Sequence, residues 1–413
     1  MPLGVKMMKN PRLRSDLQLI TTTVEGREVL AFIDPLQMTE KALTLARSML
    51  PLLQMLDGTN DLRDLQVEIM RNRGGGFVSI SEIEEFIERL DQYFLLESDK
   101  FRERVRFLYE EFERKENRFP SHAGNSYDAD PVRLSRFIKD IEDELSRSGP
   151  DYRDRSIAGI LAPHIDIKIA TAAYVDLYRH LKDRTYDAAV ILGINHQWQD
   201  GLYSVTEKNY VTPFGTLKAA RDLISELKKH APPGTFATND FGHKMEHSIE
   251  FQTLFLSYFL GDGLPIVPIL CGSIHECIVE GSNIFDDERF TGMIGVLESM
   301  IKGCRGGVLL VSGVDFSHVG LKFDDPVPAH VLLPDALEND EKILSSLCEG
   351  KPEKIFENAL ETKNRFNVCG LPAMLVFSTL LKGAQAEILS HETYDEEATE
   401  SAVTYASMIL TDD

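Results

Sequence analysis

Four short segments of this 413-residue chain place a histidine next to an apolar run. His164, His196 and His318 each come shortly after such a run, and His247 opens one. Imidazole nitrogens bind divalent metals at neutral pH, and the imidazole pKa suits proton transfer. The four segments together therefore predict a metal site or, equally, an acid–base site that needs no metal.

Carboxylates lie close to two of these histidines. Asp166 comes soon after His164, and Asp315 shortly before His318. Residues i and i+2 share a face on an extended strand, so Asp166 is predicted to join His164 and His196 as a metal ligand. The other candidates have two predicted roles: acid–base or orienting for His247, His318 and Asp315, and substrate contact for Asn195, Trp198 and Ser317.

Three apolar runs must position these side chains. They cover residues 157–161, 187–193 and 308–314. Short apolar runs closed by Gly or Pro are typical of buried strands in a parallel sheet. Open α/β sheets bind ligands just beyond the carboxyl ends of such strands. We therefore expect histidines from separate strands to meet in one crevice.

From about residue 151 onward, strand and helix patterns alternate to the end of the chain. This alternation indicates an α/β domain with helices on the faces of its sheet. Residues 386–391 and 401–410 are expected to close the sheet as strands, which could run antiparallel. The predicted fold of residues 151–413 is thus α/β, with a mixed, mainly parallel sheet flanked by helices.

Residues 1–100 show another pattern, which predicts a small α+β domain. A hairpin over 17–33 is followed by helices at about 40–56 and 61–71, a third helix with Ser81 and Glu84 at capping-box spacing, and an apolar strand at 93–96. This order is winged-helix-like. The segments L-D-G-T-N-D-L-R-D-L and I-E-E-F-I-E-R-L-D-Q-Y-F-L-L-E resemble the small PqqD-like peptide-recognition modules. Residues 101–150 are predicted to form a helical linker.

Composition limits the partners and the compartment. The net charge of −22 disfavours nucleic acid, and the third helix of the first domain carries no basic stripe. No uncharged apolar run is long enough for a membrane span. Five scattered cysteines without a C-x-x-C pair indicate a reducing cytoplasm. The sequence gives no oligomeric state.

Three further residues are expected to have structural roles. Cys369 is predicted to pack at a helix start rather than act as a nucleophile. His122 is expected to be a solvated loop residue, because no partner for it is visible in the sequence. Glu246 is expected to cap a helix, since helix N-termini favour carboxylates whatever the function.

Six motifs in order carry a resemblance to a known family. They are A-P-H, G-x-N-H, T-P-F-G, E-H-S-I-E, D-F-S-H and V-C-G, and over about residues 155–412 they resemble the Memo family, in particular the longer members known as AmmeMemoRadiSam system protein B. The resemblance implies a fold similar to the catalytic subunit of class III extradiol dioxygenases, which hold non-haem iron with two histidines and a carboxylate. The equivalent cleft of the Memo family has two histidines and a cysteine. By motif, the histidines fall on His164 and His196, and the cysteine falls on Ser317.

Serine at position 317 is a departure from the family pattern, because a hydroxyl is a poor ligand for borderline or soft metals. We expect Asp166 to complete the set, with Asp315, His247 or His318 as alternatives. A set of two histidines and a carboxylate favours iron, with zinc or copper as alternatives.

The predicted function is a metal-dependent oxidoreductase acting on a small molecule or a modified protein. The alternative is a non-catalytic cleft that binds a peptide or small ligand. The resemblance also implies a pathway shared with a radical-SAM enzyme and an Amme-domain protein.

Overall fold

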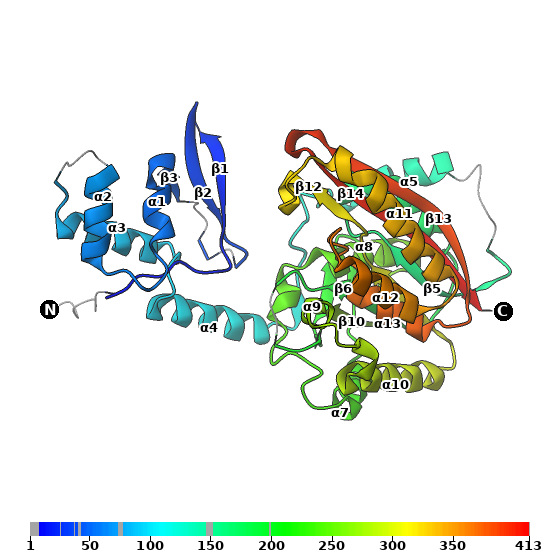
Figure 1. Ribbon diagram of the computed structural model, residues 1–413. Helices are drawn as coiled ribbons and strands as arrows, with labels where there is room; N and C mark the ends of the chain where they lie inside the picture. The colour runs from blue at the N-terminus through cyan, green and yellow to red at the C-terminus, as the bar shows by residue number, and fades with distance from the viewer. Residues whose placement is uncertain are drawn as a thin grey trace. The chain divides into compact units, whose positions relative to one another are not determined.

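The computed structural model describes residues 8–24, 26–36, 38–39, 43–72, 77–145, 152–197 and 200–412. By its internal contacts the chain forms two compact units, Met1–Phe112 and Glu113–Asp413. Figure 1 shows the helices and strands of both. Each unit has its own apolar core, and each is described by itself below.

The first unit is a three-stranded antiparallel sheet accompanied by helices. The sheet has the order β1-β2-β3 and consists of β1 (Gln18–Val24), β2 (Arg27–Ile33) and β3 (Thr44–Ala46). Its helices are η1 (Arg47–Met49), α1 (Leu50–Gln54), α2 (Leu62–Asn72), α3 (Ile80–Gln92) and α4 (Asp99–Glu113). Leu30, Leu65, Ile83, Leu90 and Leu96 are almost completely buried in its core.

Two local predictions for this unit were wrong. The helix expected over 40–56 begins only at Leu50, and Thr44–Ala46 is a strand instead. Pro51 explains the late start, because proline lacks an amide hydrogen and is tolerated only in the first turn of a helix. The capping box is formed by Ser79 and Glu82 rather than by the pair two residues later. Residues 40–42 lie outside the described part of the chain.

The second unit is built on an eight-stranded mixed sheet. Seven strands follow the order β12-β14-β5-β11-β6-β10-β7, and β13 pairs with β14. The neighbours β5, β11, β6 and β10 run parallel, while β14 pairs antiparallel with β5. The strands are β5 (Ser156–Ala162), β6 (Ala188–Ile194), β7 (Tyr203–Val205), β10 (Ile266–Cys271), β11 (Val308–Gly313), β12 (His318–Gly320), β13 (Gln385–Glu396) and β14 (Ser401–Asp412). The predicted mixed, mainly parallel sheet is confirmed, and the two closing strands are antiparallel.

Helices cover both faces of this sheet. Successive side chains of a strand point to opposite faces, and Ile191 and Leu192 of β6 accordingly lie in two different apolar clusters. One cluster contains α5 (Pro131–Leu145), α6 (Ile167–Arg179) and α8 (His247–Leu260). The other contains α7 (Arg221–His230), α9 (His275–Glu280), α10 (Glu288–Gly303), α11 (Ala329–Cys348), α12 (Pro352–Thr362) and α13 (Leu371–Leu380).

Smaller elements complete the unit. A second sheet has the order β4-β8-β9 and joins β4 (Asn117–Arg118) in parallel to β8 (Asn209–Thr212), followed by β9 (Gly215–Leu217). Four 3-10 turns are η2 (Phe241–Lys244), η3 (Ile284–Asp286), η4 (Leu321–Phe323) and η5 (Glu397–Thr399). Residues 113–145, which the sequence assigned to a linker, pack with this unit through β4 and α5.

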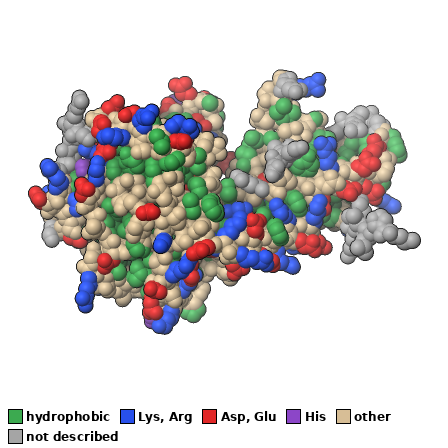
Figure 2. Space-filling view, turned by 180° about the vertical axis from the view of Figure 1, so that it is seen from behind, with side chains coloured by type: hydrophobic (Ala, Val, Ile, Leu, Met, Phe, Trp, Pro, Cys, Tyr) green, Lys and Arg blue, Asp and Glu red, His purple; other side chains and the backbone are tan. Residues whose placement is uncertain are grey.

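Charged side chains of both signs lie on the surface (Figure 2). On the face in Figure 2, Lys and Arg side chains are interspersed with Asp and Glu. Among the described residues, no helix has both the length and the apolar character that crossing a membrane requires.

Candidate metal centre

The carboxyl ends of β5 and β6 bring His164 and His196 together. The two ring centroids are 5.2 Å apart, with the rings nearly perpendicular. Each histidine follows its strand by two residues, and β11 lies between the two strands in the sheet. Parallel strands end at the same edge of a sheet, so this meeting follows from the topology.

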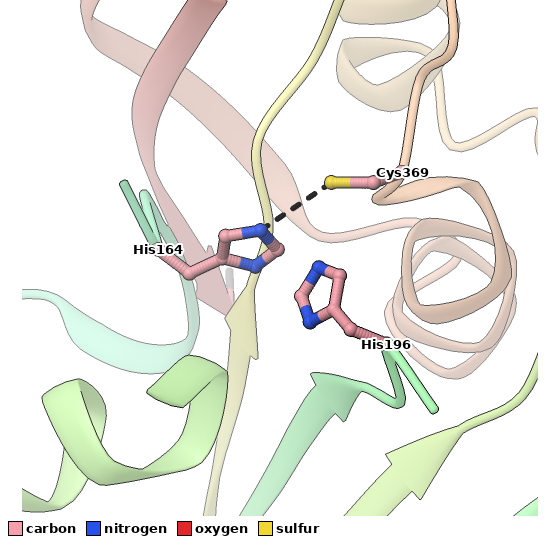
Figure 3. A group of neighbouring side chains, drawn as sticks. All are labelled: His164, His196 and Cys369. Carbon is pink, nitrogen blue, oxygen red and sulfur yellow. Dashed lines mark hydrogen bonds between the residues drawn. The ribbon is translucent and has the colours of Figure 1, made fainter. Parts of the chain in front are cut away.

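Cys369 is the third member of the group. It comes from the segment just before α13, and its Sγ lies 3.3 Å from Nε2 of His164 (Figure 3). One ligand atom from each of the three residues lies within 4.8 Å of the others. The neighbouring Gly370 permits this approach, because a Cβ there would lie 2.6 Å from the carbonyl oxygen of Asp315.

The other ring nitrogen of each histidine is held by the protein. Nδ1 of His164 lies 3.0 Å from the carbonyl oxygen of Gly313, which can only accept, so this nitrogen carries the proton. Nδ1 of His196 lies 3.0 Å from Oε2 of Glu246. A partner on one nitrogen fixes the ring and leaves Nε2 with a lone pair for a ligand.

A third histidine lies against the first two. The His247 ring stacks on His196 with centroids 5.0 Å apart, and it is 5.2 Å from His164. Its Nδ1 lies 3.2 Å from Oε1 of Glu246. Although 31% of the side chain is exposed, burial of the ring lowers the pKa of His247 to about 3, and the neighbouring imidazoles add to the effect. His247 is therefore neutral at pH 7.

Cys369 and His164 shift each other's pKa in opposite directions. Burial raises the pKa of a thiol, but the positive charge of His164 and the hydrogen bonds with His164 and His196 outweigh it and lower the pKa of Cys369 to about 5. Burial lowers the pKa of His164, yet the Asp315 carboxylate and the Cys369 thiolate raise it to about 9. Without a metal, the two groups thus form a thiolate–imidazolium pair at neutral pH.

Comparison with known proteins identifies the family of the second unit. The family model of Memo-like proteins matches residues 118–409. The chain belongs to the Memo-like family. A MEMO1 family protein of Aquifex aeolicus is 31% identical over 367 residues, which cover 87% of this chain and 90% of that protein. A MEMO1 family protein of Thermococcus kodakarensis is 28% identical, over 71% of this chain and 99% of that protein.

The Aquifex alignment is longer than the second unit, so it also includes part of the first. Among solved structures, an uncharacterized protein of Escherichia coli K12 aligns over 61% of this chain and 99% of that one. The sequence identity of this pair is 14% and the TM-score is 0.36.

Asp166, from the predicted metal set, and Ser317, at the position of the family cysteine, have other partners in this Memo-like unit. Asp166 caps α6, where its carboxylate accepts hydrogen bonds from Lys168 N and Ser126 Oγ, at 2.9 and 2.7 Å. The strand β5 already ends at Ala162, so the shared strand face that was assumed for His164 and Asp166 does not exist. Ser317 is fully buried and donates its hydroxyl hydrogen to Asp340 at 2.6 Å. The thiol that lies next to the two histidines belongs to Cys369.

The remaining predicted residues are distributed around the centre. Asp315 accepts hydrogen bonds from the backbone of His164 and Ile165, and its second oxygen lies 3.5 Å from His164 Nε2. His318 is held by the Phe316 carbonyl oxygen at 3.0 Å from its Nδ1. Asn195 accepts from Gln197 N and lines a cavity beside Cys369. Trp198 lies outside the described residues.

The sequence did not indicate that His122 lies next to His247. His122 is not an isolated loop residue: its Nδ1 lies 3.1 Å from Oε2 of Glu250, and its ring centroid is 5.6 Å from that of His247. Glu250 also pairs with Arg118 at 2.5 Å and accepts from Tyr127 OH at 2.6 Å, and these three groups are almost completely buried. The first turns of α8 thus carry two carboxylates, Glu246 and Glu250, that hold imidazoles from other segments.

A second group of potential ligands consists of His196, Glu246 and His247. Its carboxylate is already engaged, because Glu246 caps α8 by accepting from Ser248 N at 2.9 Å and also holds His196. A metal there would displace these hydrogen bonds. The group with Cys369 keeps them intact and is the better candidate.

Proposed function

We propose that the Memo-like unit is a metal-dependent oxidoreductase that holds one divalent ion through His164, His196 and Cys369 and acts on a small molecule. The observation that supports it most is the convergence of two imidazole nitrogens and one thiol sulfur. The second ring nitrogen of each histidine is held by a protein oxygen, from Gly313 or Glu246. Fixing the ring through the second nitrogen is the usual arrangement around protein-bound metals.

The donor set suits a transition metal. Imidazole and thiolate bind zinc, copper and iron, and a thiolate in place of the predicted carboxylate makes zinc and copper as suitable as iron. With a pKa of about 5, Cys369 is a thiolate at neutral pH, and metal binding must release a proton from His164 instead. Three protein ligands also leave coordination positions for a substrate.

When bound, the metal would supply redox and Lewis-acid chemistry, and the residues around it have roles of their own. Neutral His247 can orient a substrate by a hydrogen bond, whereas its pKa of about 3 makes it a weak proton acceptor at pH 7. Glu246 orients His196 and His247 together, because one carboxylate oxygen faces each ring. Asp315 fixes the backbone at His164.

A non-catalytic ligand- or peptide-binding role was the sequence-based alternative. Its main support was serine at position 317 in place of a family cysteine. Cys369 provides a thiol next to both histidines, so that support no longer holds. An association with radical-SAM and Amme-domain proteins remains a proposal that rests on the family resemblance.

Cobalt titration of the full-length protein tests the proposed ligands. Wild type should bind one equivalent of Co²⁺ with a near-ultraviolet thiolate charge-transfer band. Cys369→Ser should lose the band, and His164→Ala should lose tight binding. Cys304→Ser is the matched thiol control and should behave as wild type. Equal binding by wild type, Cys369→Ser and His164→Ala would refute the site.

Redox activity needs a separate measurement. Copper- or iron-loaded protein should show reversible one-electron titration, and Cys369→Ser should shift its potential. An ion that cannot be oxidised or reduced in the protein would refute the oxidoreductase role while leaving metal binding intact.

A further inference from the structure

A cavity of about 340 Å³ lies beside the cluster and includes Cys369 in its wall. Three segments form it: the end of β6 with Asn195, the connection from β10 to α9, and residues 364–372 before α13. Its size falls in the range that binds small molecules. A molecule in this cavity would have one end at the thiol of Cys369.

Apart from the Cys369 thiol at one end and the His275 imidazole, the described lining of the cavity has no ionisable side chain. Among the described residues that line it, none is Asp, Glu, Lys or Arg, although these make up 27% of the chain. Ile194, Ile274, Ile278, Val368 and Leu371 provide buried apolar surface. A charged group moved from water into such a place without a partner loses its hydration and is strongly disfavoured.

Hydrogen-bonding groups occupy one wall of the cavity and are held in place by the backbone. Asn364 and Asn367 both have left-handed φ angles, of 47° and 50°. Asparagine tolerates this conformation better than most residues. The Asn364 side chain accepts from Val368 N at 3.0 Å, which fixes the loop locally. Backbone in sparsely populated conformations is concentrated at ligand sites, and here it lies in a polar wall of the cavity.

We infer that this cavity holds the body of the substrate, and that this body is uncharged, with an apolar surface and a hydrogen-bonding group. The inference rests on the proposed function, because it places the reacting end of the substrate at the His164–His196–Cys369 cluster. It also makes a small molecule the substrate, rather than a charged peptide segment.

The test compares two probes of equal size on the full-length protein, by saturation-transfer NMR titration. Benzamide is neutral and benzylamine is a cation at pH 7. Wild type should bind benzamide at least tenfold more tightly than benzylamine. Asn367→Asp adds a carboxylate to the wall with almost no change in shape, and should raise benzylamine affinity about tenfold.

Asn10→Asp in the first unit is the matched control. Like Asn367, Asn10 is exposed and donates one amide hydrogen bond to a carbonyl oxygen, at 3.2 Å against 3.3 Å. This control should leave both affinities at their wild-type values. The inference is overturned if benzamide does not bind, if wild type binds benzylamine as tightly as benzamide, or if Asn367→Asp matches Asn10→Asp.

Metal binding is measured on the same samples with one equivalent of Zn²⁺. Loss of metal binding with the benzamide preference intact would refute the proposed function and leave the nature of the cavity established. Retained metal binding without the preference would refute only the inference.

Discussion

The buried pair of Arg118 and Glu250 allows a quantitative prediction for Glu250→Gln. The side chains of both partners are at most 2% exposed, and their charged atoms lie 2.5 Å apart. The glutamine has the same shape but presents a donor where Arg118 donates, and it leaves the guanidinium buried without a counter-charge. Removing one partner of such a pair costs about 3–5 kcal/mol. For a unit of this size that corresponds to a melting temperature lower by roughly 5–8 °C.

The pH dependence follows from the direction of the pKa shift. Burial raises the pKa of Glu250, but the hydrogen bond from His122 and the charge of Arg118 outweigh it and hold the pKa well below the ordinary 4.5. A carboxylate with a lowered folded-state pKa stabilises the fold above its unfolded pKa and stops doing so as the pH falls. The difference between wild type and Glu250→Gln should therefore be constant above about pH 5 and should shrink at lower pH.

Differential scanning calorimetry of the two proteins between pH 3 and 8 measures this. Glu349→Gln is the matched control, because Glu349 pairs with Lys351 and Lys354 on the surface at 41% exposure. Such surface pairs contribute at most about 1 kcal/mol. A Glu250→Gln protein that melts within a degree of the Glu349→Gln control would refute the reasoning.

Three other predictions follow from the site. Asp166→Ala should retain bound metal by elemental analysis and lose about 1 kcal/mol of unfolding free energy with the α6 cap; loss of metal would show that Asp166 is a ligand. Gly193→Ala would place a Cβ 2.6 Å from Ser248 Oγ and Ile249 Cγ1 and should cost about 1–3 kcal/mol in chemical denaturation, whereas Gly295→Ala has open space in α10 and should be neutral or stabilising. In metal-free protein, alkylation of Cys369 by iodoacetamide, followed by peptide mass spectrometry, should reach half its maximal rate near pH 5; Cys304, whose pKa burial raises above 9.0, should react only in alkaline solution, and parallel profiles for the two would refute the thiolate.

The strands and two of the histidines could be predicted because their signals are local. An apolar run that ends at Gly or Pro marks a buried strand, and His164 and His196 stand directly after two such runs. Their meeting then follows from the parallel topology, which the alternating pattern already indicated. Nothing beyond the neighbouring residues was needed.

The remaining parts of the site depend on contacts that no local pattern encodes. Cys369 stands 205 positions after His164, in an apolar stretch that equally suits a helix start. His122 and its partner Glu250 are 128 positions apart. For Asp166 the difficulty was a local one: the sequence did not show that β5 ends at Ala162, so the strand face assumed for His164 and Asp166 was wrong. Contacts between residues that lie this far apart along the chain can be found only from the three-dimensional structure.

The position of β14 has a consequence for how the protein is made. This strand is the last of the described strands, yet it lies inside the sheet between β12 and β5. The carbonyl oxygen of Thr404 on β14 accepts a hydrogen bond from the backbone N–H of Phe316, and the N–H of Thr404 donates to the carbonyl oxygen of Ser317. These two bonds hold the segment that carries Asp315. During synthesis the sheet cannot close until β14 has left the ribosome. The centre would therefore be assembled only after β14 has emerged, and the nascent chain would carry an open edge at β5 until then.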